Sequence, residues 1–493
     1  MKKIIIIGGG IAGLSAGIYA LKAGFEAEIY EKNAVAGGEC MGWNRGGCHI
    51  DNCIHWLTGT SPTSSMHKVW RDVGALDDNT QYADVDMFYS CRVGGRECTL
   101  HNDLDRTERE LIAISPDDEA EIRKLIQHLR YTEDCQLPAE KPMDMMSIKD
   151  YIALGKNMRN MPKVMKEYGK ISIAELAARF RSPLIRTLLT DYMPAEYTAF
   201  SFLISYATMT SGNGKIPAGG SLAMAMRMLE KFKENGGKIH LNAPVKKILI
   251  ENKKAVGIEL ESNEKITADF IISAVDTNLL FTRLLDERLI PAKLTLPYRS
   301  SEKHPTMSGF QIAYEADEAC APKGTILFGC EPFKMNKKEI SRLSLKSYSY
   351  EKSFAPEGKT VLQTNVAQYD DDFLYWKSLS PEDYRSVKAE LSEAVAERIT
   401  TQFPELKGSL KMLDCWTPLT YERYCGAYHG SYMGFIIRPG VKQSKINGVI
   451  KGIGGLYIAG QWIMSPGGLP IAAVSGKFAV QRILKKLGRS VEI

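Results

Sequence analysis

The sequence predicts a mixed α/β protein in which a glycine-rich loop joins a buried parallel strand to a helix. A β-branched run, Ile4–Ile7, leads directly into Gly8-Gly9-Gly10-Ile11-Ala12-Gly13, which has the spacing G-x-G-x-x-G. A second apolar strand, Ala27–Tyr30, ends at Glu31, whose carboxylate is placed to accept hydrogen bonds from a ribose diol. The Rossmann-type unit that binds dinucleotides has this order: a strand, a glycine turn, a helix and a second strand that ends in an acidic residue.

Each residue of the glycine loop has a mechanical reason. Gly8 makes the tight turn, Gly10 lets the backbone approach a pyrophosphate, and Gly13 lets the helix pack closely on the strand. The helix begins at Ile11 and Ala12, where free N–H groups and the positive end of the helix dipole face the phosphates.

The same N-terminal stretch also has the composition of a signal peptide or a membrane span. Two lysines precede eighteen uncharged residues, Ile4–Leu21. However, glycines recur within it at ordered spacings and no A-x-A cleavage site follows, which favours the Rossmann interpretation. No other stretch approaches the roughly twenty apolar residues of a spanning helix, so we expect no membrane crossing.

Composition is that of a globular protein of several domains. The 493 residues predict roughly two to four domains. A net charge of +5 is small for this length and argues against a dedicated nucleic-acid binder. The ten cysteines form no C-x-x-C pair and no zinc-finger spacing, so we expect reduced thiols, a cytoplasmic protein and no metal site.

A glycine doublet decides between possible dinucleotides. Gly37-Gly38 follows Glu31 after five residues, and this resembles the E-x(4–6)-G-G extension of the FAD-dependent family that contains amine oxidases and phytoene desaturases. The resemblance implies FAD as cofactor. That family carries Arg or Lys directly after the doublet, whereas this chain has Glu39, and Arg45 is the expected substitute.

The resemblance continues in the family's order along nearly the whole chain. It is most similar to the branch of phytoene desaturases, carotenoid isomerases and retinol saturases. The matching segments are Pro217–Ser221, Ser273–Asp276, Thr417–Tyr424, Leu456–Trp462 and Pro466–Pro470, the last of which precedes Ser475-Gly476. The glycine fingerprint and the resemblance together imply contacts to FAD from Gly8, Gly10, Ile11, Ala12, Gly13, Glu31, Lys32, Gly37, Gly38, Glu39, Arg45, Ile54, His55, Val245, Ala274, Gly460, Gln461, Gly468, Leu469, Pro470 and Ile471.

The cofactor domain is expected to be discontinuous, because the C-terminal motif and the N-terminal unit surround one FAD. Its predicted segments are 1–80, 212–285 and 440–493. An α+β substrate domain takes 81–211 and 286–439, with 105–205 mostly helical as a lid. A single G-x-G-x-x-G and no second βαβ unit disfavour a separate nicotinamide domain, so the electron donor or acceptor stays open.

Local patterns place several elements of the substrate domain. Val387, Leu391, Val395 and Ile399 predict a helix over 381–402, and strands are expected near 310–314 and 361–368. The segment 148–170 carries basic side chains among methionines. It predicts either an amphipathic helix on an anionic membrane face or the solvated face of a lid.

The loop around residue 50 holds the candidate chemistry. In the family it reads Phe-Asp-x-Gly-Pro beside the flavin, and here Cys53 and Ile54 occupy the Gly-Pro positions. His55 either moves a proton near neutral pH or hydrogen-bonds flavin or backbone. Cys53 is a nucleophile, a covalent flavin attachment point or a small buried thiol.

The expected function is an FAD-dependent desaturase, saturase or isomerase that acts on a hydrophobic polyene, isoprenoid or long-chain lipid. Tyr424 and Glu422 could serve as its proton groups. One alternative is an amine-oxidase-like enzyme with an aromatic cage drawn from Trp56, Trp416, Tyr421, Tyr424 and Trp462. Another is a carrier on the same fold, like a GDP-dissociation inhibitor, without redox chemistry. Peripheral contact with the inner face of a membrane is a further expectation.

Overall fold

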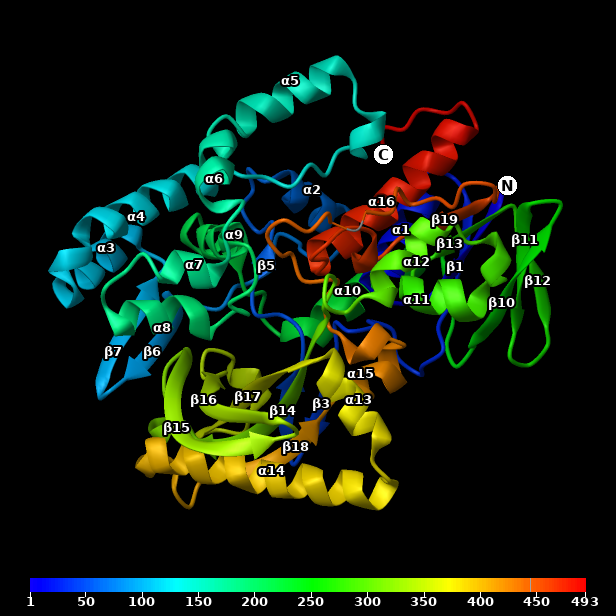
Figure 1. Cartoon of the computed structure of the whole chain (residues 1–493). Helices are drawn as coiled ribbons and strands as arrows, with labels where there is room; N and C mark the ends of the chain where they lie inside the picture. Colours follow the sequence, from blue (N-terminus) through cyan, green and yellow to red (C-terminus); the bar gives the residue numbers. More distant parts are fainter. Residues whose placement is uncertain (444) are drawn as a thin grey trace.

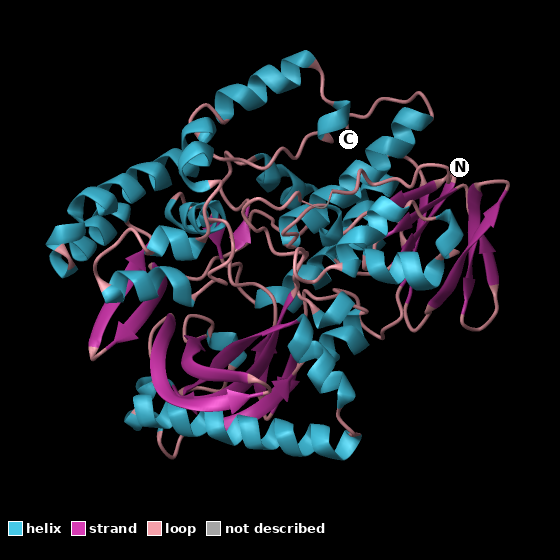
Figure 2. Cartoon of the chain, in the orientation of Figure 1, coloured by secondary structure: helices cyan, strands magenta, loops and turns pink. Residues whose placement is uncertain are grey.

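The computed structural model describes residues 1–443 and 445–493. Two larger sheets and one small sheet, with helices around them, organise this part of the chain (Figure 1, Figure 2). The predicted α/β class with a Rossmann-like unit is confirmed. The predicted domain boundaries stay predictions.

The Rossmann-like unit is built on a five-stranded parallel sheet. Its strand order is β19 (Leu456–Ile458), β13 (Phe270–Ser273), β1 (Lys3–Ile7), β2 (Glu26–Tyr30) and β9 (Lys238–His240). Ile4, Ile5 and Ile6 have no exposed surface, as expected for a β-branched run in a sheet covered on both faces. The sheet therefore joins segments that are separated by hundreds of residues in the sequence.

Three helices close on this sheet at very short range. They are α1 (Ile11–Lys22), α10 (Gly220–Glu234) and α16 (Leu469–Lys486). A Cβ at Gly17 would lie 2.7 Å from the Phe232 ring of α10, and a Cβ at Gly476 would lie 2.6 Å from the Ala12 carbonyl oxygen of α1. Only glycine allows these helices to approach so closely, so the C-terminal helix packs directly on the first one.

A small antiparallel sheet lies beside the parallel one, at the right of Figure 1. It consists of β10 (Val245–Glu251), β11 (Lys254–Leu260) and β12 (Lys265–Thr267). The alternating sequence predicts strands over 245–250 and 255–260, and β10 and β11 span these ranges.

The largest sheet has seven strands. Their order is β18 (Lys411–Trp416), β14 (Met307–Asp317), β17 (Lys359–Tyr369), β16 (Lys338–Ser347), β15 (Thr325–Met335), β6 (Met87–Val93) and β7 (Arg96–His101). Its lower face in Figure 1 is covered by α14 (Pro381–Gln402), which spans the range predicted from helical spacing. Val395 and Ile399 of this helix are buried in the core that it shares with the sheet.

Helices fill most of the chain between the first hairpin of this sheet and β8 (Gly214–Lys215). They are α3 (Leu104–Ile114), α4 (Glu119–Glu133), α5 (Ile148–Asn157), α6 (Met161–Tyr168), α7 (Ile173–Ala177), α8 (Pro183–Asp191) and α9 (Ala199–Thr210). Phe202 and Leu203 of α9 are buried in their common core, so these apolar residues belong to the protein interior.

The segment 148–170 forms two helices, and the prediction of a single amphipathic helix is wrong. The chain breaks between α5 and α6, because Pro162 in the first turn of α6 lacks the N–H group that would continue the preceding helix. Helix α5 stands away from the body at the top of Figure 1 and buries none of its residues. Ile148, Tyr151 and Ile152 are exposed apolar side chains on it.

Shorter elements complete the fold. They are β3 (Gly42–Arg45), β4 (Cys48–Asp51), β5 (Leu57–Thr58), α2 (Ser65–Asp72), α11 (Thr277–Leu279), α12 (Ala292–Thr295), α13 (Asp370–Ser378) and α15 (Pro418–Cys425). Among the helices of residues 1–443 and 445–493, none combines the length and the apolar character needed to cross a bilayer.

Candidate functional site

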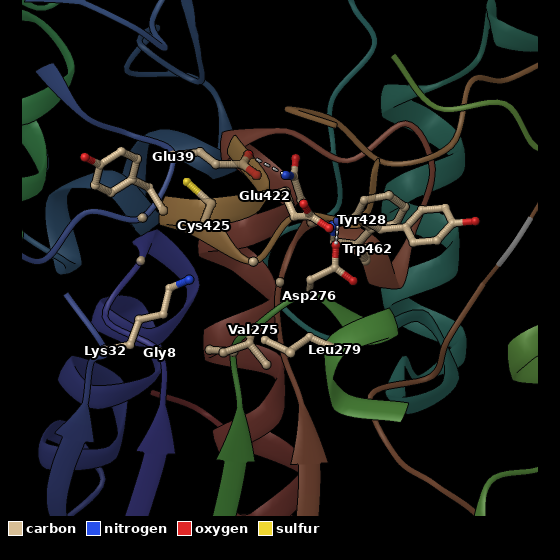
Figure 3. Close-up of a pocket in the computed structure, with 18 of the residues that line it drawn as sticks. Gly8, Lys32, Glu39, Val275, Asp276, Leu279, Glu422, Cys425, Tyr428 and Trp462 are labelled. Atoms are coloured by element: carbon tan, nitrogen blue, oxygen red, sulfur yellow. Dashed lines mark hydrogen bonds between the residues drawn. The ribbon is translucent and has the colours of Figure 1, made fainter. Parts of the chain in front are cut away.

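A cavity of about 880 Å³ opens at the carboxyl ends of the parallel strands. One wall is the loop that begins at Gly8, with Lys32 beside it, and the facing wall carries Val275, Asp276 and Leu279 (Figure 3). Ligands of open α/β sheets bind at this edge, where strands on either side of the first strand diverge. The volume lies within the ordinary range of small-molecule and cofactor sites.

The glycine loop leaves room for a ligand where the sequence predicts it. Gly8 has φ +98°, a conformation that favours glycine, and its N–H donates to the Tyr30 carbonyl at 2.9 Å. A Cβ at Gly10 would touch only the Gly37-Gly38 backbone, at 3.6 Å or more, so a larger side chain there would project into the cavity. A Cβ at Gly13 would lie 1.9 Å from the Gly8 oxygen, so Gly13 serves helix packing.

Glu31 is held rigidly at the end of β2. Its Oε2 accepts a hydrogen bond from the Gly9 N–H at 2.7 Å, and its Oε1 accepts from the Asn33 N–H at 2.9 Å. The residue is buried but lines the cavity. An oriented carboxylate at this strand end is suited to accept hydrogen bonds from a diol.

Two buried carboxyl groups lie between the loop and the C-terminal strand. Gln461 Nε2 donates to Glu39 Oε2 at 2.7 Å, and Asp276 accepts from the backbone N–H of Tyr428 at 2.8 Å (Figure 3). Burial raises the pKa of Glu39 to about 8 and that of Asp276 to about 6. Glu39 is therefore mostly a neutral carboxylic acid at pH 7, which reduces its repulsion of an anionic ligand.

Four side chains lie beside the inner end of the cavity: His55, Tyr192, Lys346 and Tyr432. We call the region that they surround the inner hollow. Each of the four keeps accessible surface, and they lie close together: besides burial, Lys346 shifts the pKa of His55, and Tyr432 shifts that of Tyr192. Cys53 and Tyr432 also line the cavity, which connects the two regions. Lys346 Nζ lies 4.4 Å from the centre of the Tyr348 ring and, within the described residues, has no hydrogen-bond partner.

Burial and the nearby Lys346 lower the pKa of His55 to about 3. The expectation that this imidazole titrates near neutral pH is therefore corrected: the ring is neutral at pH 7, because an imidazolium would lose its hydration beside a second cation. A neutral imidazole can still donate and accept hydrogen bonds in the hollow.

The structure corrects the role predicted for Arg45. This side chain lies on the β3–β4 hairpin, pairs with Asp414 of β18 at 3.2 Å, and is not among the residues that line the cavity. The basic groups that do line it include Lys32, Arg283 and Arg423.

Tyr424 and Glu422 lie at the wrong end of the cavity for proton transfer beside His55. The Tyr424 carbonyl accepts from Asn33, the neighbour of Glu31, and the Tyr424 ring is 54% exposed. Glu422 pairs with Lys377 at 2.6 Å near the surface. Tyr421, which directly precedes Glu422 on α15, points inward instead and hydrogen-bonds Gln311 and Asn52.

Five other residues of the predicted cofactor set do not line the cavity: Gly13, whose place is in helix packing, His55, which lies in the inner hollow, and Ile54, Pro470 and Ile471. Ile54 turns into the core and donates its N–H to Ser221 Oγ at 2.8 Å. Pro470 and Ile471 follow Leu469 in the first turn of α16, where the helical repeat directs Leu469 and Ala472 toward the cavity instead. The remaining predicted residues that do line it are Gly8, Gly10, Ile11, Ala12, Glu31, Lys32, Gly37, Gly38, Glu39, Val245, Ala274, Gly460, Gln461, Gly468 and Leu469.

Sequence reasoning left three lining or neighbouring side chains without a role: Cys40, Asp276 and Lys346. Asp276 directly follows the end of a parallel strand, which is a signal that sequence alone offers. Lys346 lies on a strand whose alternating basic residues gave no sign that one of them points inward. Cys40 depends on a hairpin pairing that the spacing did not reveal.

The Pro217–Ser221 segment holds the residue-50 loop in place. Ser221 donates to the buried carboxylate of Asp51 through both its N–H and its hydroxyl, each at 2.6 Å. A Cβ at Gly220 would lie 2.0 Å from Asp51 Oδ2, so only glycine leaves room for this contact. The hydrogen bonds between Ser221 and Asp51 therefore fix Cys53 and His55 relative to α10.

Comparison with known proteins yields one matching family. Its description is "Flavin containing amine oxidoreductase", and it matches residues 11–484. Among curated proteins, the chain is 24% identical to a lycopene-forming phytoene desaturase of Paracoccus sp., over 99% of this chain and 98% of that protein. It is 23% identical to a chloroplastic prolycopene isomerase of Daucus carota, over 98% of this chain and 80% of that protein.

Solved structures with the same fold cover nearly the whole chain. An oxidoreductase from Methanosarcina mazei matches with a TM-score of 0.61 and 19% identity, over 98% of this chain and all of the other. Cyclohexylamine oxidase from Brevibacterium oxydans matches with a TM-score of 0.57 and 16% identity, over 99% of this chain and all of the other. At such identities the likeness concerns the fold alone.

Proposed function

The chain belongs to the family of flavin-containing amine oxidoreductases, and from that premise we propose that it is a desaturase, saturase or isomerase of a hydrophobic polyene, isoprenoid or long-chain lipid. It is an FAD-dependent oxidoreductase. Relatives that span nearly its whole length carry the names phytoene desaturase and prolycopene isomerase, which supports a polyene substrate.

The proposed FAD contacts follow the length of the cavity. The Gly8–Ala12 loop and the start of α1 hold the pyrophosphate, and Glu31 holds a ribose diol. Gly460, Gln461 and the start of α16 close the cavity from the C-terminal side. When bound, FAD supplies hydride acceptance and donation.

The observation that carries the substrate proposal is the inner hollow. Its walls include the rings of Tyr192 and Tyr432, and its basic groups are a neutral His55 and a lysine without an acidic partner within the described residues. No carboxylate pair of the described residues faces it to receive a cationic amine. Apolar and aromatic walls bind a hydrocarbon by burial, and the substrate then needs only to be held against the cofactor.

The predicted aromatic cage for an amine does not form around one point. Trp56 packs edge-on against Phe88 in the helical core, whereas Trp416 donates to the Tyr421 hydroxyl at 3.1 Å beside the large sheet. Trp462 packs against Phe435, and Tyr424 is half exposed. This dispersion favours the polyene over the amine.

Substrate assays separate these classes. We expect FAD-loaded enzyme, in its oxidised and its chemically reduced form, to convert dispersed polyenes into products with altered double bonds, as followed by chromatography. Simple primary amines should leave the oxidised flavin spectrum unchanged without oxygen. Bleaching by amines together with inert polyenes would contradict the proposal.

Gly10→Val tests the proposed pyrophosphate site. The variant should fold, because the protein leaves room for the new Cβ, yet lose FAD, because the branched side chain would occupy the ligand's space. Flavin content and thermal unfolding measure the two effects. Gly13→Val is the matched control, since its clash with Gly8 should destabilise the fold itself; full flavin content in Gly10→Val would mean that the phosphates lie elsewhere.

We also propose that α5 and α6 touch an anionic membrane face. The support is the exposed apolar group Ile148, Tyr151 and Ile152 on α5, which stands away from the body, together with the exposed Lys156 on α5 and Lys163 on α6. Apolar and basic side chains together favour adsorption at such an interface. A hydrophobic substrate could then enter from the lipid phase.

A further inference from the structure

We propose that Cys40 and Cys53 form a redox-active dithiol that exchanges two electrons with FAD. The pairing comes from the β3–β4 hairpin, in which Gly42 lies opposite Asp51. The Asn52 N–H then donates to the Met41 carbonyl at 3.1 Å, which continues the pairing by one residue. Continued by one more residue, this register sets Cys40 against Cys53, just beyond the ends of the two strands.

The two thiols contact each other and the cofactor cavity. Both residues line that cavity, and Cys40 is fully buried while Cys53 keeps some accessible surface. A hydrogen bond with Cys40, together with burial, raises the pKa of Cys53. Cys53 therefore keeps its proton in the resting protein, and its thiol lies next to that of Cys40.

Hydrogen bonds hold both cysteines in place. Disulfide formation would then need only a small approach of the two Cβ atoms. Cys40 Sγ donates to the Ser221 carbonyl at 3.3 Å, and the Cys53 N–H donates to Asp51 Oδ1 at 3.1 Å. Residues directly opposite on antiparallel strands have Cβ atoms about 4.5–5.5 Å apart. A disulfide requires about 3.5–4.5 Å between them, a change of about 1 Å.

The electron balance closes within the holoenzyme. Two S–H bonds break and one S–S bond forms; the two electrons and two protons pass to FAD, which becomes fully reduced. In the other direction, reduced FAD returns both electrons and protons and cleaves the disulfide. An external dithiol reductant can regenerate the pair by thiol–disulfide exchange. This route would admit electrons to a chain whose sequence contains a single dinucleotide-binding fingerprint.

A second cross-strand pair in the same chain supplies a matched control. Cys91 lies opposite Cys98 on β6 and β7, but neither residue lines the cavity. Cys91 Sγ is instead engaged by Asp191 and Arg342, at 3.4 and 3.3 Å. This pair should stay reduced whatever the state of FAD.

The test counts electrons and thiols in the holoenzyme. Air-oxidised wild-type protein, titrated with dithionite without oxygen, should take up one two-electron equivalent more per FAD than Cys40→Ser or Cys53→Ser. Alkylation of the denatured air-oxidised protein should modify two fewer cysteines than alkylation after reduction. Peptide mass spectrometry should identify a disulfide that joins residues 40 and 53, and apoprotein in air should form it far more slowly.

Three results would overturn the proposal. Complete alkylation of all ten cysteines in air-oxidised holoenzyme would show that the bond does not form. Equal disulfide formation in apoprotein would show that FAD is not the oxidant. Loss of the extra equivalent in Cys91→Ser/Cys98→Ser, with Cys40→Ser unchanged, would assign it to the other pair. The peptide measurement on wild type needs no variant, so a folding defect in a serine variant does not obscure the answer.

Discussion

Glu39 occupies the position at which the family carries a basic residue, and its raised pKa makes FAD binding sensitive to pH. The folded protein retains this proton between pH 4.5 and about 8, where the unfolded chain has released it. The free energy of unfolding therefore falls as the pH rises through that window. Above it, an ionised Glu39 beside the proposed pyrophosphate adds repulsion.

We expect the apparent Kd of FAD to rise by up to about tenfold per pH unit above pH 8 in wild type. In Glu39→Gln the same curve should be flat, because the amide keeps the hydrogen bond with Gln461 without titrating. Flavin fluorescence titrations measure both. An unchanged pH dependence in the Gln variant would assign the effect to Asp276 or another group.

Buried Lys346 lowers the free energy of unfolding. Residues that are retained for function commonly have this effect. Burial lowers its pKa from 10.5 to about 8, so the folded state binds this proton less tightly than the unfolded chain does. The deficit is complete below pH 8 and disappears as the pH rises toward 10.5. We expect Lys346→Met to raise the free energy of unfolding at pH 7 by about 1–3 kcal/mol.

Urea unfolding measures this gain, and turnover should fall in the same variant if the ammonium contacts substrate or cofactor. Lys337→Met, on an exposed residue of the preceding turn, should change stability by no more than about 0.5 kcal/mol. A stability loss in Lys346→Met would mean that the lysine has a compensating partner in solution.

Helices α5 and α6 make the membrane proposal testable. Exchange of Lys156, Lys163 and Lys166 for Gln should reduce flotation with anionic liposomes, because each lysine near such a surface contributes about 1 kcal/mol. Exchange of the exposed Lys334, Lys407 and Lys411 for Gln removes the same charge elsewhere and should leave flotation unchanged. Equal loss in both variants would indicate attraction by net charge alone.

Periodicity and turn chemistry predicted the elements that depend on local sequence. Strand β1 and helix α14 carry their own patterns, and the glycine loop between β1 and α1 is a local motif. The break between α5 and α6 also has a local signal, because Pro162 in the first turn of α6 lacks a backbone N–H. Local signals of this kind predicted the wall of the cavity that the glycine loop and Glu31 form.

The features that the sequence did not predict depend on contacts between residues that are far apart in the chain. Arg45 lies in the predicted loop, but Asp414 of a distant strand holds it away from the cavity. The pKa of His55 depends on Lys346, about three hundred residues later, and on enclosure by walls from several segments. No window of sequence around either residue contains this information.

The parallel sheet places side by side strands that are synthesised at very different times. A ribosome makes β1 and β2 first, but their neighbours β13 and β19 emerge only after 270 and 456 residues, and α16 later still. The nascent glycine loop therefore waits, exposed, for a partner helix that is translated more than four hundred residues later. We expect cofactor capture to follow the synthesis of α16: chains stalled before residue 456 should retain no FAD, whereas released chains that include α16 should. Pulldown of stalled complexes with flavin quantification checks this, and FAD on the shorter chains would mean that the N-terminal unit folds and binds by itself.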